Sequence, residues 1–358
     1  MSIIRPWKSQ NLSEIRLLAA PSEASGVLAA EKAAKSMQPL FFEPVLKRAR
    51  WGGVRLASLL GKPAGPETDY AESWEIADHG ADQSRVSVGP LQGLTMEQLV
   101  RDHGRALFGA GAELTQFPLL IKYLDASDWL SLQVHPNDAQ AKTFDPSENG
   151  KTEAWVIMEA AADSRICAGL LAGVSAQDLR QAIAAGTVED CLHMLPVHAG
   201  DCVFVPAGTV HALGPGILLA EIQQQSNLTF RLHDWGRVGT DGKPRPLHLE
   251  ESLACTDFDR GPVEPVSPRI VEEHGEAVEE LVRCPWFVIR RRVAARPFVV
   301  PPDGRFRILL TVSGDGVLRS DGQEWRIVRG STVLLPADRV DVRVLPRQSL
   351  TVIEVLPF

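Results

Sequence analysis

The stretch CVFVPAGTVHALGPGILLAEIQQQ, residues 202–225, decides the fold class of this chain. It consists of short apolar runs that break at Pro206 and at the turn around Gly214 and Gly216. Runs of the same kind occur upstream in FPLLIKYLDA (117–126), WLSLQVHP (129–136) and EAWVIMEA (153–160). Strands of about 5 to 8 residues with Gly and Pro boundaries are typical of a sandwich or barrel, not of a parallel doubly wound sheet. We therefore predict an all-β fold.

One segment between these strands has a different character. In SAQDLRQAIAAGTVEDCLHML (175–195), the residues Leu179, Ile183 and Val188 follow helical spacing. Ser175 stands at an N-cap position and Gly186 is a stop signal. The pattern predicts a helical insertion near residues 172–195.

A weak internal repeat accounts for the length of the chain. AGDCVFVPAGTVH (199–211) aligns with RGSTVLLPADRVD (329–341), and EAWVIMEA (153–160) aligns with RILLTVSG (307–314). The helical insertion explains why the two blocks lie farther apart in the first copy. In this register Arg307 replaces Glu153 and Asp341 replaces His211, so we expect no metal in the second copy.

The repeat and the changes in composition suggest three parts. Residues 1–38 are rich in Ala and Ser and lack the apolar core of a signal peptide, so we expect a poorly ordered N-terminal extension. Residues 39–260 form a metal-binding domain with the helical insertion. A Pro-rich stretch at 261–268 then leads to a smaller C-terminal β-domain at 268–358.

The composition limits the partners and the compartment. The formal charge of -8 comes without any basic block, which argues against nucleic acid. No apolar run reaches the roughly 20 residues that span a bilayer, so we expect no membrane segment. The five cysteines include no CxxC pair, which favours free thiols in the cytoplasm. The oligomeric state stays open.

Three residues of the strand-rich part have the chemistry of a metal site. Neutral imidazoles and a carboxylate are typical ligands of zinc and similar divalent ions, and a catalytic site uses about three of them. His135, Glu153 and His211 supply this set. Gln133 precedes His135 by two residues and shares its face in an extended strand, so it is a candidate fourth ligand.

Four longer segments carry a resemblance to a known family. ARWGGVRL (49–56), WLSLQVHPND (129–138), NGKTEAWVIME (149–159) and PAGTVHALGPGILLAEIQQQSNLTFRLHDWGR (206–237) resemble the type I mannose-6-phosphate isomerases, particularly the short bacterial form. The resemblance covers residues 39–255 densely and the remainder only loosely. It implies a cupin jelly roll, one zinc or other divalent ion, and ligands at Gln133, His135, Glu153 and His211.

The same resemblance suggests the reaction and its catalytic residues. It implies interconversion of mannose 6-phosphate and fructose 6-phosphate, with Arg231 as the catalytic arginine. Exchange between an aldose and a ketose needs a base, for which Glu221 and Lys151 are both candidates. Longer family members read His-Lys-Pro-Glu where this chain reads Gly150-Lys151-Thr152-Glu153, so any role of that histidine is absent here.

Phosphate recognition needs donors and positive charge. We expect it from Ser131 and from Lys122 or Lys151, although Lys122 could equally be an outward-facing strand residue. Trp51 is a candidate wall of the sugar pocket.

Two alternative functions remain open from the sequence. Two histidines and one carboxylate also form the metal site of non-haem iron oxygenases, and a cupin can bind a sugar without turning it over.

Overall fold

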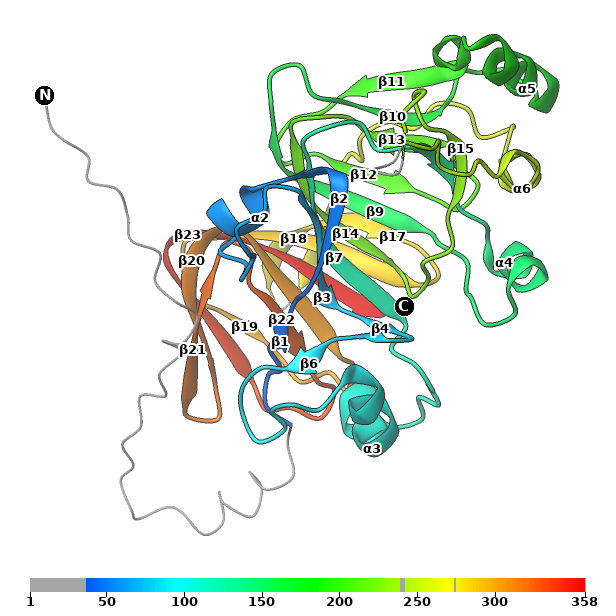
Figure 1. The fold of residues 1–358 in the computed structure, drawn as a ribbon. Coiled ribbons are helices and arrows are strands. Elements are labelled where there is room, and N and C mark those ends of the chain that lie inside the picture. Colours follow the sequence, from blue (N-terminus) through cyan, green and yellow to red (C-terminus); the bar gives the residue numbers. More distant parts are fainter. Residues whose placement is uncertain (1–36, 239–241, 274, 358) are drawn as a thin grey trace, which may run out of the picture.

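The computed structural model describes residues 37–238, 242–273 and 275–357 (Figure 1). The predicted N-terminal extension therefore lies outside the described residues, apart from its last two positions. There, the backbone N–H of Met37 donates to the carbonyl of Asp338 at 2.7 Å. No helix among the described residues is long and apolar enough to cross a membrane.

Two antiparallel sheets face each other in the first part of the chain, as the predicted jelly roll requires. The six-stranded sheet has the order β12–β9–β14–β7–β3–β2, and the five-stranded sheet has the order β11–β10–β13–β8–β15. The strands of the first are β2 (Val45–Gly53), β3 (Tyr70–Ile76), β7 (Leu119–Ala126), β9 (Glu153–Ala160), β12 (Cys202–Val205) and β14 (Ile217–Gln224). Those of the second are β8 (Leu132–Val134), β10 (Arg165–Leu170), β11 (Leu192–Pro196), β13 (His211–Leu213) and β15 (Phe230–His233).

The residues after 268 form an eight-stranded sheet of their own (Figure 1). Two short ribbons, β1 with β6 and β4 with β5, lie beside the main sheets. The eight strands are β16 (Arg269–Glu273), β17 (Glu276–Arg283), β18 (Phe287–Ala294), β19 (Phe298–Val300), β20 (Arg307–Ser320), β21 (Gln323–Val328), β22 (Thr332–Leu335) and β23 (Val342–Pro357). The ribbon strands are β1 (Phe42–Glu43), β4 (Asp78–His79), β5 (Asp82–Gln83) and β6 (Arg85–Val86). The all-β prediction is confirmed.

The six-stranded sheet is covered on both faces. Alternate residues of its strands, among them Trp155 and Leu219, pack with Ile166 and Leu213 of the five-stranded sheet. The residues between them face the eight-stranded sheet in a second apolar cluster. That cluster includes Leu119, Ile121, Tyr123, Val156, Leu218, Ala220, Ile308, Leu310, Ile353 and Val355. The predicted domains thus share one core, and their boundary stays a prediction.

The predicted helical insertion is present. Helix α5 (Ala176–Ala185) begins after Ser175, whose hydroxyl accepts from the N–H of Asp178, and ends at Gly186 with φ of 73°. Both ends agree with the predicted N-cap and stop, and the rest of the insertion forms the short helix η2 (Val188–Cys191) and the beginning of strand β11. α5 packs on the outer face of the five-stranded sheet, where Leu179 contacts the cluster of Cys167 and Ala212.

Four further α-helices among the described residues were not predicted. They are α2 (Arg55–Ser58), α3 (Met96–Phe108), α4 (Asp138–Phe144) and α6 (Leu249–Cys255). Both α3 and α4 begin at a capping box, with Thr95 and Gln98 in the first and Asn137 and Gln140 in the second. That spacing is visible in the sequence, although alternating apolar strands surround it.

The internal repeat is confirmed by strand pairing. In the first copy Val205 of β12 pairs with Glu153 of β9, and in the second Leu335 of β22 pairs with Arg307 of β20. The turns match as well, because Gly200 donates to the carbonyl of Ile157 as Gly330 does to that of Thr311.

Candidate metal centre

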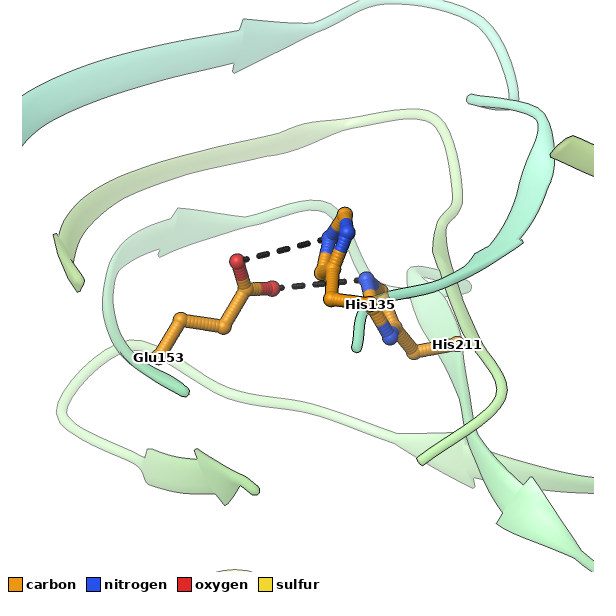
Figure 2. A group of neighbouring side chains, drawn as sticks. All are labelled: His135, Glu153 and His211. Carbon is orange, nitrogen blue, oxygen red and sulfur yellow. Dashed lines mark ion pairs between the residues drawn. The ribbon is translucent and has the colours of Figure 1, made fainter. Parts of the chain in front are cut away.

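Three predicted ligands lie together between the two facing sheets (Figure 2). Glu153 opens β9, His211 opens β13, and His135 follows β8 directly. One ligand atom of each lies within 4.8 Å of the others, and each residue is only 1% exposed. Glu153 Oε1 is 3.4 Å from His211 Nε2, and Oε2 is 3.7 Å from His135 Nε2.

Backbone carbonyls fix the orientation of both imidazoles. The Nδ1 of His135 pairs with the carbonyl of Leu228 at 3.0 Å, and the Nδ1 of His211 pairs with that of Thr209 at 2.8 Å. Since a carbonyl only accepts, each Nδ1 carries the proton and each Nε2 keeps its lone pair. Both lone pairs are directed to the side where Glu153 lies (Figure 2).

The protonation states of the two histidines also suit metal binding. Burial lowers the pKa of His211 to about 4 and that of His135 well below its usual value, so both rings are neutral. Both carboxylate oxygens of Glu153 and the Nε2 of His211 are buried without a hydrogen-bond partner among the described residues. Such unsatisfied atoms are costly in a protein interior, and a shared cation would satisfy all three.

Lys151 stands beside these ligands. Its Nζ is 3.0 Å from His135 Nε2 and 3.2 Å from Glu153 Oε2. Burial raises the pKa of Glu153, the ammonium of Lys151 opposes that rise, and the net value is about 7. The two-residue spacing between Lys151 and Glu153 places both side chains at the same site, as predicted.

Gln133 and Arg231 lie in one row with His211. In the strand register Gln133 of β8 is directly opposite His211 of β13 on one side and Arg231 of β15 on the other. Side chains that are directly opposite point to the same face of a sheet. The outward face belongs to Leu132, Val134, Phe230 and Leu232, so this row faces the site.

Arg231 is held in place by hydrogen bonds and forms no ion pair with a described residue. Its Nη1 donates to the carbonyl of Pro246, its backbone N–H donates to His248, and its Nε is buried with no partner. Among the described residues no carboxylate lies within ion-pair distance of Arg231. Burial lowers its pKa, and the nearby Arg245 adds to this effect.

Glu221 and Lys122 form a second charged group on the six-stranded sheet. They are directly opposite in the register, with Lys122 Nζ 3.2 Å from Glu221 Oε1 and 3.4 Å from Glu72. Trp155 Nε1 donates to the other oxygen of Glu221 at 3.1 Å. Burial alone would raise the pKa of Glu221, but Lys122 and Lys151 outweigh it and the net pKa is lowered.

The outward-facing alternative for Lys122 is wrong, because the residue is only 4% exposed. Burial would lower the pKa of Lys122, yet Glu72 and Glu221 outweigh that effect and raise it. Ser131 is buried two residues before Gln133, and Trp51 lies in the apolar cluster that also contains Trp155.

Sequence reasoning missed several polar residues around the site. Asp234 binds Arg237 and Arg245 beside Arg231, each at 2.5 Å. Asp138 and Gln224 are hydrogen-bonded to the segment that carries Lys151. No local pattern distinguishes these residues from surface polar groups, because Asp138 and Gln224 bind backbone groups 12 and 72 residues away and an i,i+3 pair such as Asp234 with Arg237 is common on protein surfaces.

Comparison with known proteins gives one consistent family. The model of the phosphomannose isomerase type I catalytic domain matches residues 40–154. Mannose-6-phosphate isomerase ManA of Bacillus subtilis is 36% identical over 84% of this chain and 93% of its own length. The mannose-6-phosphate isomerase of Streptococcus mutans is 34% identical over 84% of this chain and 92% of its own length.

Solved structures agree with this result. The mannose 6-phosphate isomerase of Bacillus subtilis superposes with a TM-score of 0.82 at 30% identity, covering 89% of this chain and 99% of that one. A zinc-bound mannose 6-phosphate isomerase has a TM-score of 0.72 at 16% identity, over 90% of this chain and all of that one, which shows a shared fold. With the identities spread over most of both chains, the chain belongs to the type I phosphomannose isomerase family.

Proposed function

We propose that this chain is a mannose-6-phosphate isomerase, which interconverts mannose 6-phosphate and fructose 6-phosphate with one zinc ion. The observation that carries the proposal is the convergence of two neutral imidazoles on a buried, unsatisfied carboxylate, at His135, His211 and Glu153. The relatives bearing this enzyme name cover most of the chain, which favours the isomerase over the iron oxygenase and the non-catalytic sugar-binding alternatives.

The ligands of the ion would be His135, Glu153 and His211, with Gln133 as the fourth. Two imidazole nitrogens and a carboxylate oxygen are an ordinary zinc set, and other divalent ions accept the same groups. A bound zinc ion would supply Lewis-acid polarisation of the carbonyl and hydroxyl oxygens of the sugar.

The chemical step needs a base beside the carbonyl and a cation for the developing charge. We assign the base to Glu221, because its lowered pKa keeps it ionised and ready to accept the proton from the carbon beside the carbonyl. Removal of this proton gives an enediolate, which carries negative charge on oxygen until the proton returns to the neighbouring carbon. Arg231 has no carboxylate partner among the described residues, so its charge is available to stabilise that oxygen. Lys151 adds a second cation at the ligands.

The sugar phosphate would bind at the edge of the site that is richest in donors. Ser131 and Lys122 remain the predicted phosphate contacts, and Trp51 the predicted wall of the pocket. Arg237 and Arg245 share the buried carboxylate of Asp234, and Arg237 also pairs with Asp128 at 3.6 Å, so with Arg231 the region holds three cations against two carboxylates. This local excess suits a dianionic ester in an otherwise acidic protein.

The cysteines and the net charge bear on the compartment and the partners. We infer a cytoplasmic enzyme, because all five cysteines are buried and free. Nucleic acid is not expected to bind, since the net charge is -8.

A coupled assay tests the proposal. The purified protein should convert mannose 6-phosphate to fructose 6-phosphate, lose this activity with a strong chelator, and regain it with zinc. Activity that survives complete metal removal would refute the metal role. Stoichiometric iron with oxygen uptake would instead support the oxygenase, and sugar binding without turnover would support the non-catalytic alternative.

A further inference from the structure

Lys151 sits on a segment whose backbone is fixed at three consecutive residues. The N–H of Gly150 donates to Asp138 Oδ1 at 2.8 Å, and that of Lys151 donates to the carbonyl of Pro136 at 3.0 Å. The N–H of Thr152 donates to Gln224 Oε1 at 2.9 Å. Proline at position 152 could not make the last of these bonds.

Asp138 and Gln224 are also bonded to each other. Gln224 Nε2 donates to Asp138 Oδ1 at 2.9 Å, so one carboxylate oxygen receives both this bond and that of Gly150. The second oxygen, Oδ2, accepts from Trp286 Nε1 of the eight-stranded sheet region at 3.1 Å. The two side chains thus bind the backbone on either side of Lys151, Asp138 at Gly150 and Gln224 at Thr152.

The close approach of the two backbones leaves no room at position 150. A Cβ added to Gly150 would lie 2.5 Å from the backbone N of Asp138 and 2.7 Å from the carbonyl carbon of Asn137. Real Cβ atoms do not approach backbone atoms so closely. A glycine is therefore required for Asp138 to reach the 150–152 segment.

We propose that Asp138 and Gln224 are positioning residues, which hold the 150–152 segment so that the ammonium of Lys151 stays beside His135 and Glu153. The two residues touch no reacting atom in this arrangement. They act through Lys151, whose Nζ lies 3.0 Å from His135 Nε2. The inference rests on the proposed function, because it needs Lys151 to assist the isomerisation.

The metal ligands themselves are held differently. Glu153 and His211 are strand residues, and the Nδ1 protons of His135 and His211 are bound by the carbonyls of Leu228 and Thr209. Loss of Asp138 or Gln224 should therefore displace Lys151 and leave the zinc site intact. Activity and zinc content separate the two effects.

The test compares Asp138→Ala and Gln224→Met with Asp145→Ala in the zinc-loaded protein. Asp145 ends the same helix α4, and one of its carboxylate oxygens likewise accepts two hydrogen bonds, both from Ser147. We expect both site variants to lower kcat by about ten-fold or more, because small displacements of a catalytic group cost large factors in rate. KM should stay within about two-fold and zinc at one ion per chain, while Asp145→Ala behaves as wild type.

Other outcomes would refute either the positioning role or the proposed function. If wild type interconverts the two sugar phosphates and both variants keep its kcat, the positioning role is refuted. Loss of zinc in parallel with activity would also refute it, because the pair would then support the ligands and not Lys151. A wild-type protein without isomerase activity would instead refute the proposed function. Far-UV circular dichroism of all variants excludes misfolding as the cause of a low kcat.

Discussion

We expect protonation of Glu153 to limit metal binding at acidic pH. Burial raises its pKa to about 7, whereas that of His211 is lowered to about 4. Between these values the histidine is already a neutral ligand, but the carboxyl group must release a proton before zinc can bind. We predict that zinc affinity rises about ten-fold per pH unit up to about pH 7 and levels off above it. Competition with a chromophoric chelator from pH 5.5 to 8 measures this.

The variant Glu153→Gln is the control for that titration. Its amide oxygen remains a possible ligand but carries no proton to release, so zinc binding should be weaker and nearly independent of pH in the same window. A wild-type affinity that does not change below pH 7 would contradict the prediction.

Glu221 and Glu72 offer a matched pair for testing the base. Both carboxylates lie within ion-pair distance of Lys122, at 3.2 and 3.4 Å. If Glu221 removes the proton, Glu221→Gln should lower kcat by about 10²- to 10⁴-fold, while Glu72→Gln has a much smaller effect. Coupled-assay kinetics at saturating substrate measure both. Equal losses in the two variants would mean that Glu221 only holds Lys122.

The metal ligands could be predicted from the sequence, but the residues that position the neighbouring backbone could not. His135, Glu153 and His211 could be named because metal ligands come from a short list of residue types, and strand alternation places Gln133 on the same face as His135. Asp138 and Gln224 could not be named, because they lie 12 and 72 residues from the backbone groups that they bind. Lys122 was ambiguous for a related reason, since only the tertiary fold brings Glu72 and Glu221 to it.

At the scale of elements, equivalent strands of the two repeat copies carry different groups, which are candidate metal ligands in the first copy and a set of ion pairs in the second. In the first copy, Glu221 of β14 is opposite Trp155 of β9, and Trp155 lies two residues after Glu153. In the second copy, Glu354 of β23 is opposite Leu309 of β20, and Leu309 lies two residues after Arg307. Glu354 therefore occupies the position equivalent to Glu221, and Arg307 that of Glu153. Arg307 forms ion pairs with Glu354, Asp303 and Glu273 where the first copy carries its metal ligands.

This ion-pair group gives a prediction for stability. Arg307 is only 3% exposed and Glu354 only 4%, so Arg307→Met would leave the buried carboxylate of Glu354 without its cation, whereas Glu273 and Asp303 keep other arginine partners. We expect a loss of about 3 to 5 kcal/mol in the free energy of unfolding, measured by guanidinium denaturation.

Arg319 on the same strand is the control, since it pairs with Glu324 at a half-exposed position. Arg319→Met should cost less than about 1 kcal/mol. Equal stabilities of Arg307→Met and wild type would mean that the buried group contributes nothing to the fold.

The helices show where capping residues in the local sequence are sufficient to predict a helix. α5 was predicted because Ser175 and Gly186 mark both of its ends. α3 has an equally good start at Thr95, but its C-cap Gly109 has φ of 100° and an extended ψ, and Gly104 interrupts its sequence. Its buried residues, such as Leu99 and Leu107, pack in the core that the two predicted domains share, and this packing is not visible in the local sequence.

At the scale of the whole molecule, the six-stranded sheet is the central layer. The five-stranded sheet and the site cover one face, and the eight-stranded sheet covers the other (Figure 1). β7 and β14 are buried along their whole length, which explains why both begin as apolar runs, and the polar residues within them, such as Lys122, Asp125 and Glu221, are buried as well. The repeat suggested two domains, but it carried no information on the core between them.

A shared core predicts that the two parts unfold together. Ile353 of β23 is fully buried in the cluster that joins the eight-stranded and six-stranded sheets. Ile353→Ala should lower the free energy of unfolding by about 2 to 5 kcal/mol. Isomerase activity and the circular dichroism of the strands should disappear at the same denaturant concentration, because loss of the outer sheet exposes the apolar face of the sheet that carries Glu153 and Glu221.

Val293 on the adjacent strand β18 is 66% exposed, so Val293→Ala serves as the control and should change stability by less than about 0.5 kcal/mol. Two separate transitions, with activity retained after the first, would contradict the shared core. The metal-binding part would then fold independently of residues 268–358. A single transition that moves with Ile353→Ala would instead mean that the C-terminal copy of the repeat stabilises the copy that carries the site.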